Sequence, residues 1–222
     1  MKLLSIILLL FLSFSQLLAQ VNIKTGDTLT IIKSNKYYSC EINYINFYNN
    51  GKNIKMLNDS INGYTSYLKN ALENDLDDDI KSEMDSGFIA GKYILIVNTK
   101  YNILQNGTIS IFFEIYYYTL GAHGNVFYKS LHYSTTNNEF IQLPEIANIN
   151  GQDDLDDFNI LLLKYFDNKD SCFSSKPKIE TENYNMFYVD DKNLTIVFPA
   201  YELGSYACGA AFIKIPLYEL KK

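Results

Sequence analysis

Apolar residues follow two different periods along the chain, and the change between them predicts the secondary structure. Residues 37–47 alternate between apolar and polar side chains, which is typical of a half-buried strand. Between about Ile54 and Leu76 the apolar residues instead recur every three or four positions, as on one face of a helix. The members of this stripe are Leu57, Ile61, Tyr64, Leu68 and Leu72. The pattern leaves open whether the helix continues through the following acidic stretch to Met84.

From Gly91 onward the pattern is mainly that of strands. A continuous apolar run at 93–97 predicts a strand buried on both faces, and Asn106-Gly107 predicts a hairpin into an alternating segment at 108–118. Asp153 to Phe166 is predicted to be a second helix, with Leu155, Phe158, Leu162 and Phe166 as its stripe. The remaining expected strands are 21–33, which could also be a loose arm, 126–134, 139–143, 184–189, 194–198 and 212–215.

The order of these elements predicts an α+β fold with antiparallel sheets and two main helices packed on one face. The strict alternation of strands and helices that builds a doubly wound sheet is absent from the sequence. We expect three regions: a signal peptide at 1–19, an N-terminal half of strands around one helix at 20–120, and a C-terminal half at 121–222. The boundary is placed near Leu120 because a glycine-flanked turn, Gly121 to Gly124, follows it.

The first residues have the composition of an export signal. Lys2 is followed by an apolar run to Leu18 and then by Ala19, which predicts a secretory signal peptide cleaved after Ala19. The run is short and interrupted for a membrane span, which needs about 20 apolar residues. An uncleaved N-terminal anchor stays open because Leu17 is a poor residue at the −3 position. The expected location is therefore secreted or periplasmic, with no membrane span after cleavage.

Charge narrows the range of partners. The chain has 25 acidic and 19 basic residues, a net charge of −6, and every basic residue is lysine. This balance argues against nucleic-acid binding, which needs a basic surface. Removal of the 19-residue signal leaves 203 residues with 18 lysines and a net charge of −7. A negative surface would steer a cationic partner, although a charge of this size is also ordinary for a soluble domain.

Catalytic and metal-binding chemistry has little support. The two histidines, His123 and His132, have no nucleophile motif such as GxSxG beside them. The cysteines, Cys40, Cys172 and Cys208, are far apart and lack the spacing of a metal site. Their odd number allows at most one disulfide, and the sequence leaves open which pair forms it. We therefore expect no enzyme, no cofactor and no metal.

His123 has two interpretations. It could be an exposed imidazole at a binding site, or it could hydrogen-bond a neighbouring backbone group and so fix the turn between two strands. The second is favoured, because one histidine without partners makes poor catalysis. The tyrosines that end the preceding strand, Tyr116 to Tyr118, could stack on sugars or anchor a protein interface. Most of the 19 tyrosines are nevertheless explained as strand formers.

Three stretches carry a resemblance to a known family. They are Tyr118 to Asn125, the strand-turn-strand Phe187 to Phe198, and Tyr201 to Gly209 with its closing Ile215-Pro216. Together they resemble the extracytoplasmic domain of lysozyme-sensing anti-sigma factors (RsiV type), which also precedes the catalytic domain of peptidoglycan N-acetylglucosamine deacetylases (PdaC type). The family turn typically reads Gly-Gly-Ala-His-Gly, and the closing motif typically reads Tyr-Glu-Ile-Ala-Pro-Tyr-Ala-x-Gly.

This chain departs from those motifs at four positions. Leu120 replaces the first turn glycine, Gly204-Ser205 replaces Ala-Pro, and Cys208 replaces a small residue. A leucine at positive φ would cost about 1 kcal/mol or more, so the turn could differ from that of the family.

The resemblance implies an exported, non-catalytic binding module of the cell envelope. Its expected ligand is a basic protein such as lysozyme or a peptidoglycan-type glycan. The alternatives are an envelope hydrolase, or an accessory domain for peptidoglycan modification, that uses the His123 turn, and a purely structural envelope component. The expected partner-binding residues are Tyr118, His123, Asn125, Tyr201 and Tyr206. The expected structural motif residues are Gly121, Gly124, Gly209 and Pro216.

Overall fold

The computed structural model of the chain describes residues 22–168, 170–181 and 184–220. The expected signal peptide at 1–19 lies outside these residues. Within the described ranges, no helix is long and apolar enough to cross a membrane.

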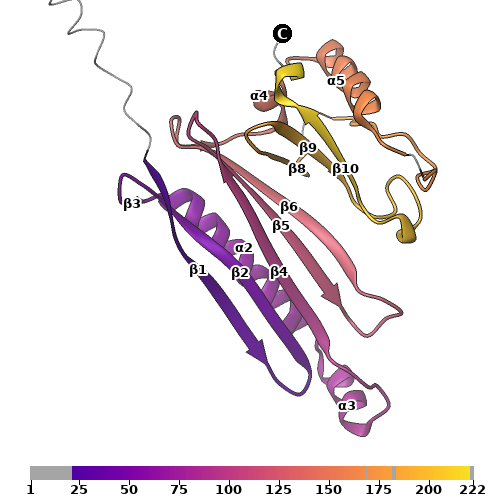
Figure 1. Ribbon diagram of the computed structural model, residues 1–222. Helices are drawn as coiled ribbons and strands as arrows, with labels where there is room; N and C mark the ends of the chain where they lie inside the picture. The colour runs from indigo at the N-terminus through magenta and orange to yellow at the C-terminus, as the bar shows by residue number, and fades with distance from the viewer. Residues whose placement is uncertain (1–21, 169, 182–183, 221–222) are drawn as a thin grey trace, which may run out of the picture.

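Two β-sheets of different size form the frame of the molecule (Figure 1). The large sheet has seven strands in the order β1-β2-β4-β5-β6-β7, with β3 paired to β2, and the small sheet has the order β10-β9-β8. The strands of the large sheet are β1 (Ile23–Ser34), β2 (Tyr38–Asn49), β3 (Lys52–Asn53), β4 (Tyr93–Ile103), β5 (Thr108–Tyr118), β6 (Asn125–Ser134) and β7 (Glu139–Phe140). The small sheet consists of β8 (Phe187–Val189), β9 (Asn193–Phe198) and β10 (Ala211–Pro216).

The helices are distributed over both sheets, which confirms the expected α+β class. They are α2 (Lys55–Asn74), α3 (Asp78–Ser86), α4 (Leu143–Ala147) and α5 (Gln152–Tyr165), with short 3-10 turns η1 (Tyr206–Cys208) and η2 (Leu217–Leu220). The helix α2 packs on β2 and β4, and α5 packs on β10. Each of the two main helices thus covers its own sheet.

The helix α2 owes its position to the apolar stripe that the sequence predicts. Leu57, Ile61 and Leu72 are buried to 1% exposure or less. Asn58 on the same helix is also buried, and its side-chain amide bonds both the N–H and the C=O of Phe47 on β2. Because α2 carries the chain back along the sheet, β2 and β4 pair in parallel, whereas the other strand pairs of the described residues are antiparallel.

The acidic stretch starts a new helix and does not continue α2. The side chain of Asp77 accepts a hydrogen bond from the Ile80 N–H and so caps α3, and two further aspartates complement the dipole of its first turn. Gly87 ends α3 at φ 78°, a left-handed conformation that favours glycine.

The first hydrophobic core lies between α2 and the large sheet. One face of β5 contributes Ile109, Ile111, Phe113 and Ile115, which are all buried, as their alternation predicts. On β4, Tyr93, Leu95 and Val97 are buried, whereas the intervening isoleucines are half-buried. The segment at 93–97 is therefore fully buried on one face only.

A second core begins at about residue 143. It joins α4, α5 and the small sheet, and Leu155, Phe158 and Leu162 of α5 are buried in it. Leu143, expected in a short strand, begins α4 and is completely buried. The division expected near Leu120 falls between β5 and β6, which are hydrogen-bonded neighbours in one sheet. The change from one core to the other follows β7, because strand pairing holds 125–140 in the large sheet.

The two sheets meet along β5 and β6. The Val189 N–H on β8 donates to the Ser110 hydroxyl on β5 at 2.9 Å. The rings of His132 on β6 and Phe187 on β8 stack with centroids 3.9 Å apart. His132 is 4% exposed, and its burial lowers the pKa of the imidazole to about 3. A neutral imidazole is thus built into the contact between the sheets.

We predict that His132 makes the protein less stable in acid. The folded-state pKa of about 3 lies below the ordinary value of 6.5, so the unfolded chain binds one proton more between these values. Stability should therefore fall as pH falls from 6.5 towards 3. His132→Phe keeps a ring against Phe187 but does not titrate, and its denaturant-unfolding curves should show a shallower loss over this window. If the stability of the wild type and of His132→Phe falls in parallel with pH, the loss of stability in acid is not due to His132.

Candidate functional site

In the turn between β5 and β6, Leu120 adopts the left-handed backbone conformation although it is not a glycine. Leu120 has a φ of 64°, in the region that costs a non-glycine residue about 1 kcal/mol or more. Its side chain packs against the first core and approaches Gly91 so closely that a Cβ there would lie 2.7 Å from Leu120 Cδ2. The packing of Leu120 offsets the backbone cost, and the departure from the family motif does not remove the positive φ.

The carbonyl group of Gly124 holds His123 of this turn and Tyr206 of η1 together. The rings of His123 and Tyr206 stack with centroids 3.9 Å apart and planes inclined by 17°. The Tyr206 hydroxyl donates to the Gly124 carbonyl oxygen at 2.5 Å, and His123 Nδ1 lies 3.1 Å from the same oxygen. Because a carbonyl oxygen only accepts, the contact places the hydrogen on Nδ1. This is the contact expected of a histidine that fixes the turn.

Gly124 is required at this point for a steric reason. A Cβ added to it would lie 2.3–2.4 Å from ring atoms of Tyr116. The Tyr116 ring therefore occupies the place of a side chain, and the backbone of the turn comes close enough for its carbonyl to bind both aromatic residues. In contrast, a Cβ on Gly121 would have its nearest neighbour at 3.9 Å.

A second tyrosine extends the stack outward. The ring of Tyr201 lies 5.6 Å from that of Tyr206 and is 64% exposed, and His123 is exposed as well. Tyr201 has a φ of 76°, an unfavourable value for a bulky residue. Strained residues of this kind gather at binding sites, where the surrounding structure holds them in place. We call His123, Tyr201 and Tyr206 the aromatic platform.

A pocket of about 310 Å³ adjoins the platform. Val126 and Tyr128 of β6 form one wall, and Tyr206 borders the pocket from the opposite segment. The remaining lining residues are Ala200, Ala207, Cys208, Gly209 and Ala210. Because these residues are small, the segment around η1 leaves open space beside β6. We call this space the platform pocket.

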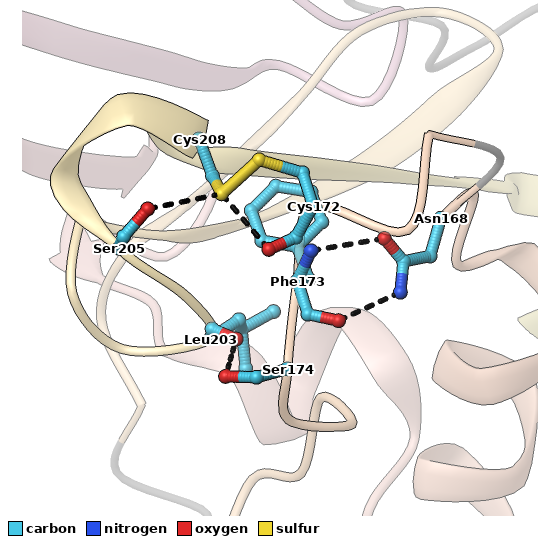
Figure 2. The surroundings of a disulfide bond; sticks show 7 residues. All are labelled: Asn168, Cys172, Phe173, Ser174, Leu203, Ser205 and Cys208. Atoms are coloured by element: carbon cyan, nitrogen blue, oxygen red, sulfur yellow. Dashed lines mark hydrogen bonds between the residues drawn. A yellow bond between two sulfur atoms is a disulfide. The ribbon is translucent and has the colours of Figure 1, made fainter.

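A disulfide fixes the segment that carries Tyr206 (Figure 2). Cys172 pairs with Cys208 at the end of η1, across 36 residues of sequence, whereas Cys40 is free and buried in the first core. The Asn168 side chain bonds both the N–H and the C=O of Phe173, which orders the loop next to Cys172. The platform therefore rests on a cross-linked loop.

Two departures from the family motif are explained together by this cross-link. A Cβ on Gly204 would lie 3.1 Å from the Cys172 carbonyl oxygen and 3.3 Å from the Cys208 sulfur. Glycine at 204 thus allows the close approach of the Cys172 loop, and Cys208 supplies the bond that holds it. The same approach lets the N–H groups of Ser174 and Ser175 donate to the Leu203 carbonyl at 2.9 Å.

The other expected site residues lie near the platform but outside its ring stack. Tyr118 ends β5 opposite Ile94, and Asn125 begins β6 as an exposed residue. Among the structural residues, Gly209 follows η1 at φ 69°, and Pro216 ends β10. The sequence analysis missed the platform pocket and Tyr128. The run of small residues at 207–211 was the available signal for a close approach of backbone.

The chemistry of the site favours contact over proton transfer. Among the described residues, the polar contact of the His123 ring is with a backbone carbonyl, and a nucleophile or carboxylate partner is not in place. Partial burial raises the pKa of the Glu202 carboxyl next to Tyr201. The described part of the chain also contains no group of three histidine, cysteine or acidic residues arranged to hold a metal ion.

Comparisons with known proteins agree with the motifs. Residues 31–126 match the family model described as deacetylase PdaC, and residues 142–218 match the model of a protein of unknown function, DUF3298. The first match confirms the expected resemblance to PdaC-type proteins, and the second adds the name DUF3298 for the C-terminal region. A search of curated proteins found no significant match.

Two solved structures resemble the whole chain. A DUF3298 family member from Bacteroides fragilis has a TM-score of 0.63 at 17% identity, over 91% of this chain and 93% of that chain. A DUF3298 family protein from Pseudomonas aeruginosa has a TM-score of 0.49 at 14% identity, over 90% of this chain and 92% of that chain. The first similarity shows that both regions of this chain share the fold of a DUF3298 family structure.

We predict opposite outcomes for the two glycines of the turn. Gly124→Ala should lower the free energy of unfolding by about 1–3 kcal/mol, because the new methyl group overlaps the Tyr116 ring. Gly121→Ala is the matched control and should be close to neutral, since its Cβ would lie 3.9 Å from the His123 carbonyl oxygen, an ordinary contact distance. Thermal unfolding followed by circular dichroism measures both. Equal melting temperatures for the two variants would show that the Tyr116 ring does not exclude a side chain at position 124.

We also predict that the disulfide stabilises the platform. Replacing Cys172 and Cys208 by serine should lower the free energy of unfolding by about 3–4 kcal/mol, the loop-closure value for a 36-residue separation. Hydrogen exchange at 201–210 should accelerate more than exchange in α2. Ser205→Ala keeps the bond and serves as the control. Unchanged exchange at 201–210 would mean that packing alone fixes the segment.

Proposed function

We propose that this chain, whose two regions match the PdaC and DUF3298 family models, is a non-catalytic binding module of the cell envelope. The observation that carries the proposal is the aromatic platform: a stacked His123–Tyr206 pair with the exposed ring of Tyr201 beside it. Rings held in this way offer a large contact area without further loss of side-chain entropy.

The contacts that hold the platform are already formed before a ligand binds. Binding therefore has no further entropic cost for ordering these side chains. The Gly124 carbonyl orients His123 and Tyr206, and the disulfide at Cys208 fixes η1. A ligand would therefore meet a surface already in its bound shape, which is the main source of affinity in small interfaces. The adjoining platform pocket provides a recess for one group of the ligand.

The leading partner is a basic protein of lysozyme-like charge. Export with removal of residues 1–19 would leave a net charge of −7, so that a cationic partner is steered towards the chain. A peptidoglycan-type glycan is the second candidate, favoured by the stacked rings, because sugar faces pack on tyrosine. The two candidates differ in salt dependence: binding of a basic protein should weaken as salt increases, whereas stacking on a glycan should not.

The enzymatic alternative has less support in the geometry. A hydrolase, or an accessory domain that modifies peptidoglycan, would use the His123 imidazole as acid or base. That imidazole bonds a backbone carbonyl and stacks on Tyr206, which are the contacts of a positioned ring. The observation that supports a role in binding thus also accounts for the histidine without catalysis.

We predict that Tyr201→Ala weakens binding by about tenfold or more, as loss of an aromatic anchor does. Isothermal calorimetry with hen lysozyme and with soluble peptidoglycan fragments measures the effect. Tyr67→Ala is the matched control, because Tyr67 on α2 is 65% exposed against 64% for Tyr201. Both variants should keep the wild-type melting temperature.

Two results would contradict the proposal. One is the absence of heat with both ligands at micromolar concentration. The other is equal weakening by Tyr201→Ala and Tyr67→Ala, which would move the contact away from the platform. A hydrolytic activity that His123→Ala abolishes at unchanged melting temperature would favour the enzymatic alternative instead.

A further inference from the structure

The outer edge of β6 is paired only at its C-terminal end. The strand β7 covers Tyr133 and Ser134, and then the Ile141 N–H donates to the His132 carbonyl at 3.0 Å. The Asn138 N–H donates to the Ser134 carbonyl at 2.8 Å. The backbone groups of residues 134 and 132 therefore point away from β5, towards this edge.

The backbone groups of every second residue towards the start of β6 point in the same outward direction. The register between β5 and β6 runs without a shift from 125 to 134, so Ser130, Tyr128 and Val126 also direct their N–H and C=O groups outward. Within the described residues, β6 has only β5 and β7 as neighbouring strands, and β7 stops short of these positions. The outward backbone groups of Val126 and Tyr128, both half-buried residues, are therefore open to pairing, whereas Ser130 is buried.

Two pockets border this open edge. The platform pocket is lined by Val126 and Tyr128, and a second pocket of about 230 Å³ is lined by Ser130 and His132. These four residues lie at alternate positions of β6, so their side chains share one face of the strand. We call the second space the His132 pocket.

The His132 pocket holds a polar group without a partner. The Ser130 hydroxyl is buried and has no hydrogen-bond partner among the described residues, and Ser130 as a whole is 6% exposed. The rest of the wall is mixed: its polar residues are Ser60, Lys129, Gln142 and Asn185, and its apolar residues are Leu131, Phe140, Ile141 and Phe187. An unpaired buried hydroxyl costs free energy, which a ligand with a matching polar group would recover.

We propose that an extended segment of a partner protein adds to β6 as a further strand of the large sheet. Its backbone would pair with Val126 and Tyr128, on the same edge of β6 that β7 covers at the other end of the strand. One apolar side chain would enter the platform pocket, and a small polar side chain four positions away would enter the His132 pocket, because Val126 and Ser130 are separated by four residues. The proposal uses the protein branch of the proposed function but not the identity of that protein.

The edge is reached through the platform pocket, which Val126 and Tyr128 border. Figure 1 shows the small sheet beside β6, and the two are in contact at the ring pairs Tyr128–Phe212 and His132–Phe187. Backbone pairing along β6 would supply affinity, and the two pockets would select side chains at alternate positions. The aromatic platform lies at the Val126 end, so that a bound segment would also pass beside it.

The experiment selects a displayed library of random decapeptides on the wild-type protein. Selected peptides should share an apolar residue and a small polar residue at a spacing of four. Val126→Pro removes one outward N–H without disturbing a bond to β5 and should weaken their binding by about tenfold. Phe127→Thr is the control: its exposed side chain lies on the opposite face of β6, and the outward N–H groups and the pocket residues stay unchanged, so its binding should match the wild type.

Peptide chemistry provides a readout that does not depend on the variant. N-methylation of alternate peptide amides should abolish binding in one register and leave it intact in the other, because only one set of amides faces β6. This series decides the question on the wild-type protein where Val126→Pro does not fold, as judged by near-ultraviolet circular dichroism.

Several results would overturn the proposal. They are no enrichment of peptides, equal affinity for Val126→Pro and Phe127→Thr, or indifference to the N-methylated register. A wild-type dimer in sedimentation that Val126→Pro dissociates would assign the edge to a second copy of this chain instead. Peptides that bind while lysozyme and glycan do not would leave the strand addition standing and refute only the proposed partners.

Discussion

The structure depends on the burial of β5 on both of its faces. From Thr108 to Phe113 every residue of the strand is buried, one face under α2 and the other against the small sheet. Such a strand has no freedom to shift, since a slip of one residue would exchange its two faces. The strand β6 is held in register along it, and the turn between them is therefore projected at a fixed place. The platform inherits its position from this packing.

Features that the local sequence pattern determines were predictable from the sequence, whereas features that depend on long-range contacts were not. The stripe at 57–72 and the alternation at 109–115 are local, and the structure has both. The membership of 125–140 in the large sheet depends on pairing with β5, a long-range contact that the turn after Leu120 does not reveal. The pairing of Cys172 with Cys208 likewise depends on a contact across 36 residues.

The candidate site shows the same limit. The motifs pointed to His123 and Tyr206 separately, but the contact between them joins residues 83 positions apart in the sequence. The reason for Gly124 is the ring of Tyr116, a residue that lies outside the family motif. The glycine at 204 is explained only once the disulfide brings Cys172 beside it. Motif residues located the region, whereas side-chain packing determined its geometry.

The edge strands β1 and β6 of the large sheet differ in how well they are protected from pairing with another chain, and this difference bears on function. An open edge invites pairing with other chains, and proteins commonly protect it with bulges and charged side chains. The strand β1 has a register irregularity between Thr25 and Thr28 and carries Lys24 and Lys33. The strand β6 keeps a regular register and places two pockets beside its open positions. A regular edge that is left open next to shaped recesses is better explained by an incoming strand than by chance exposure.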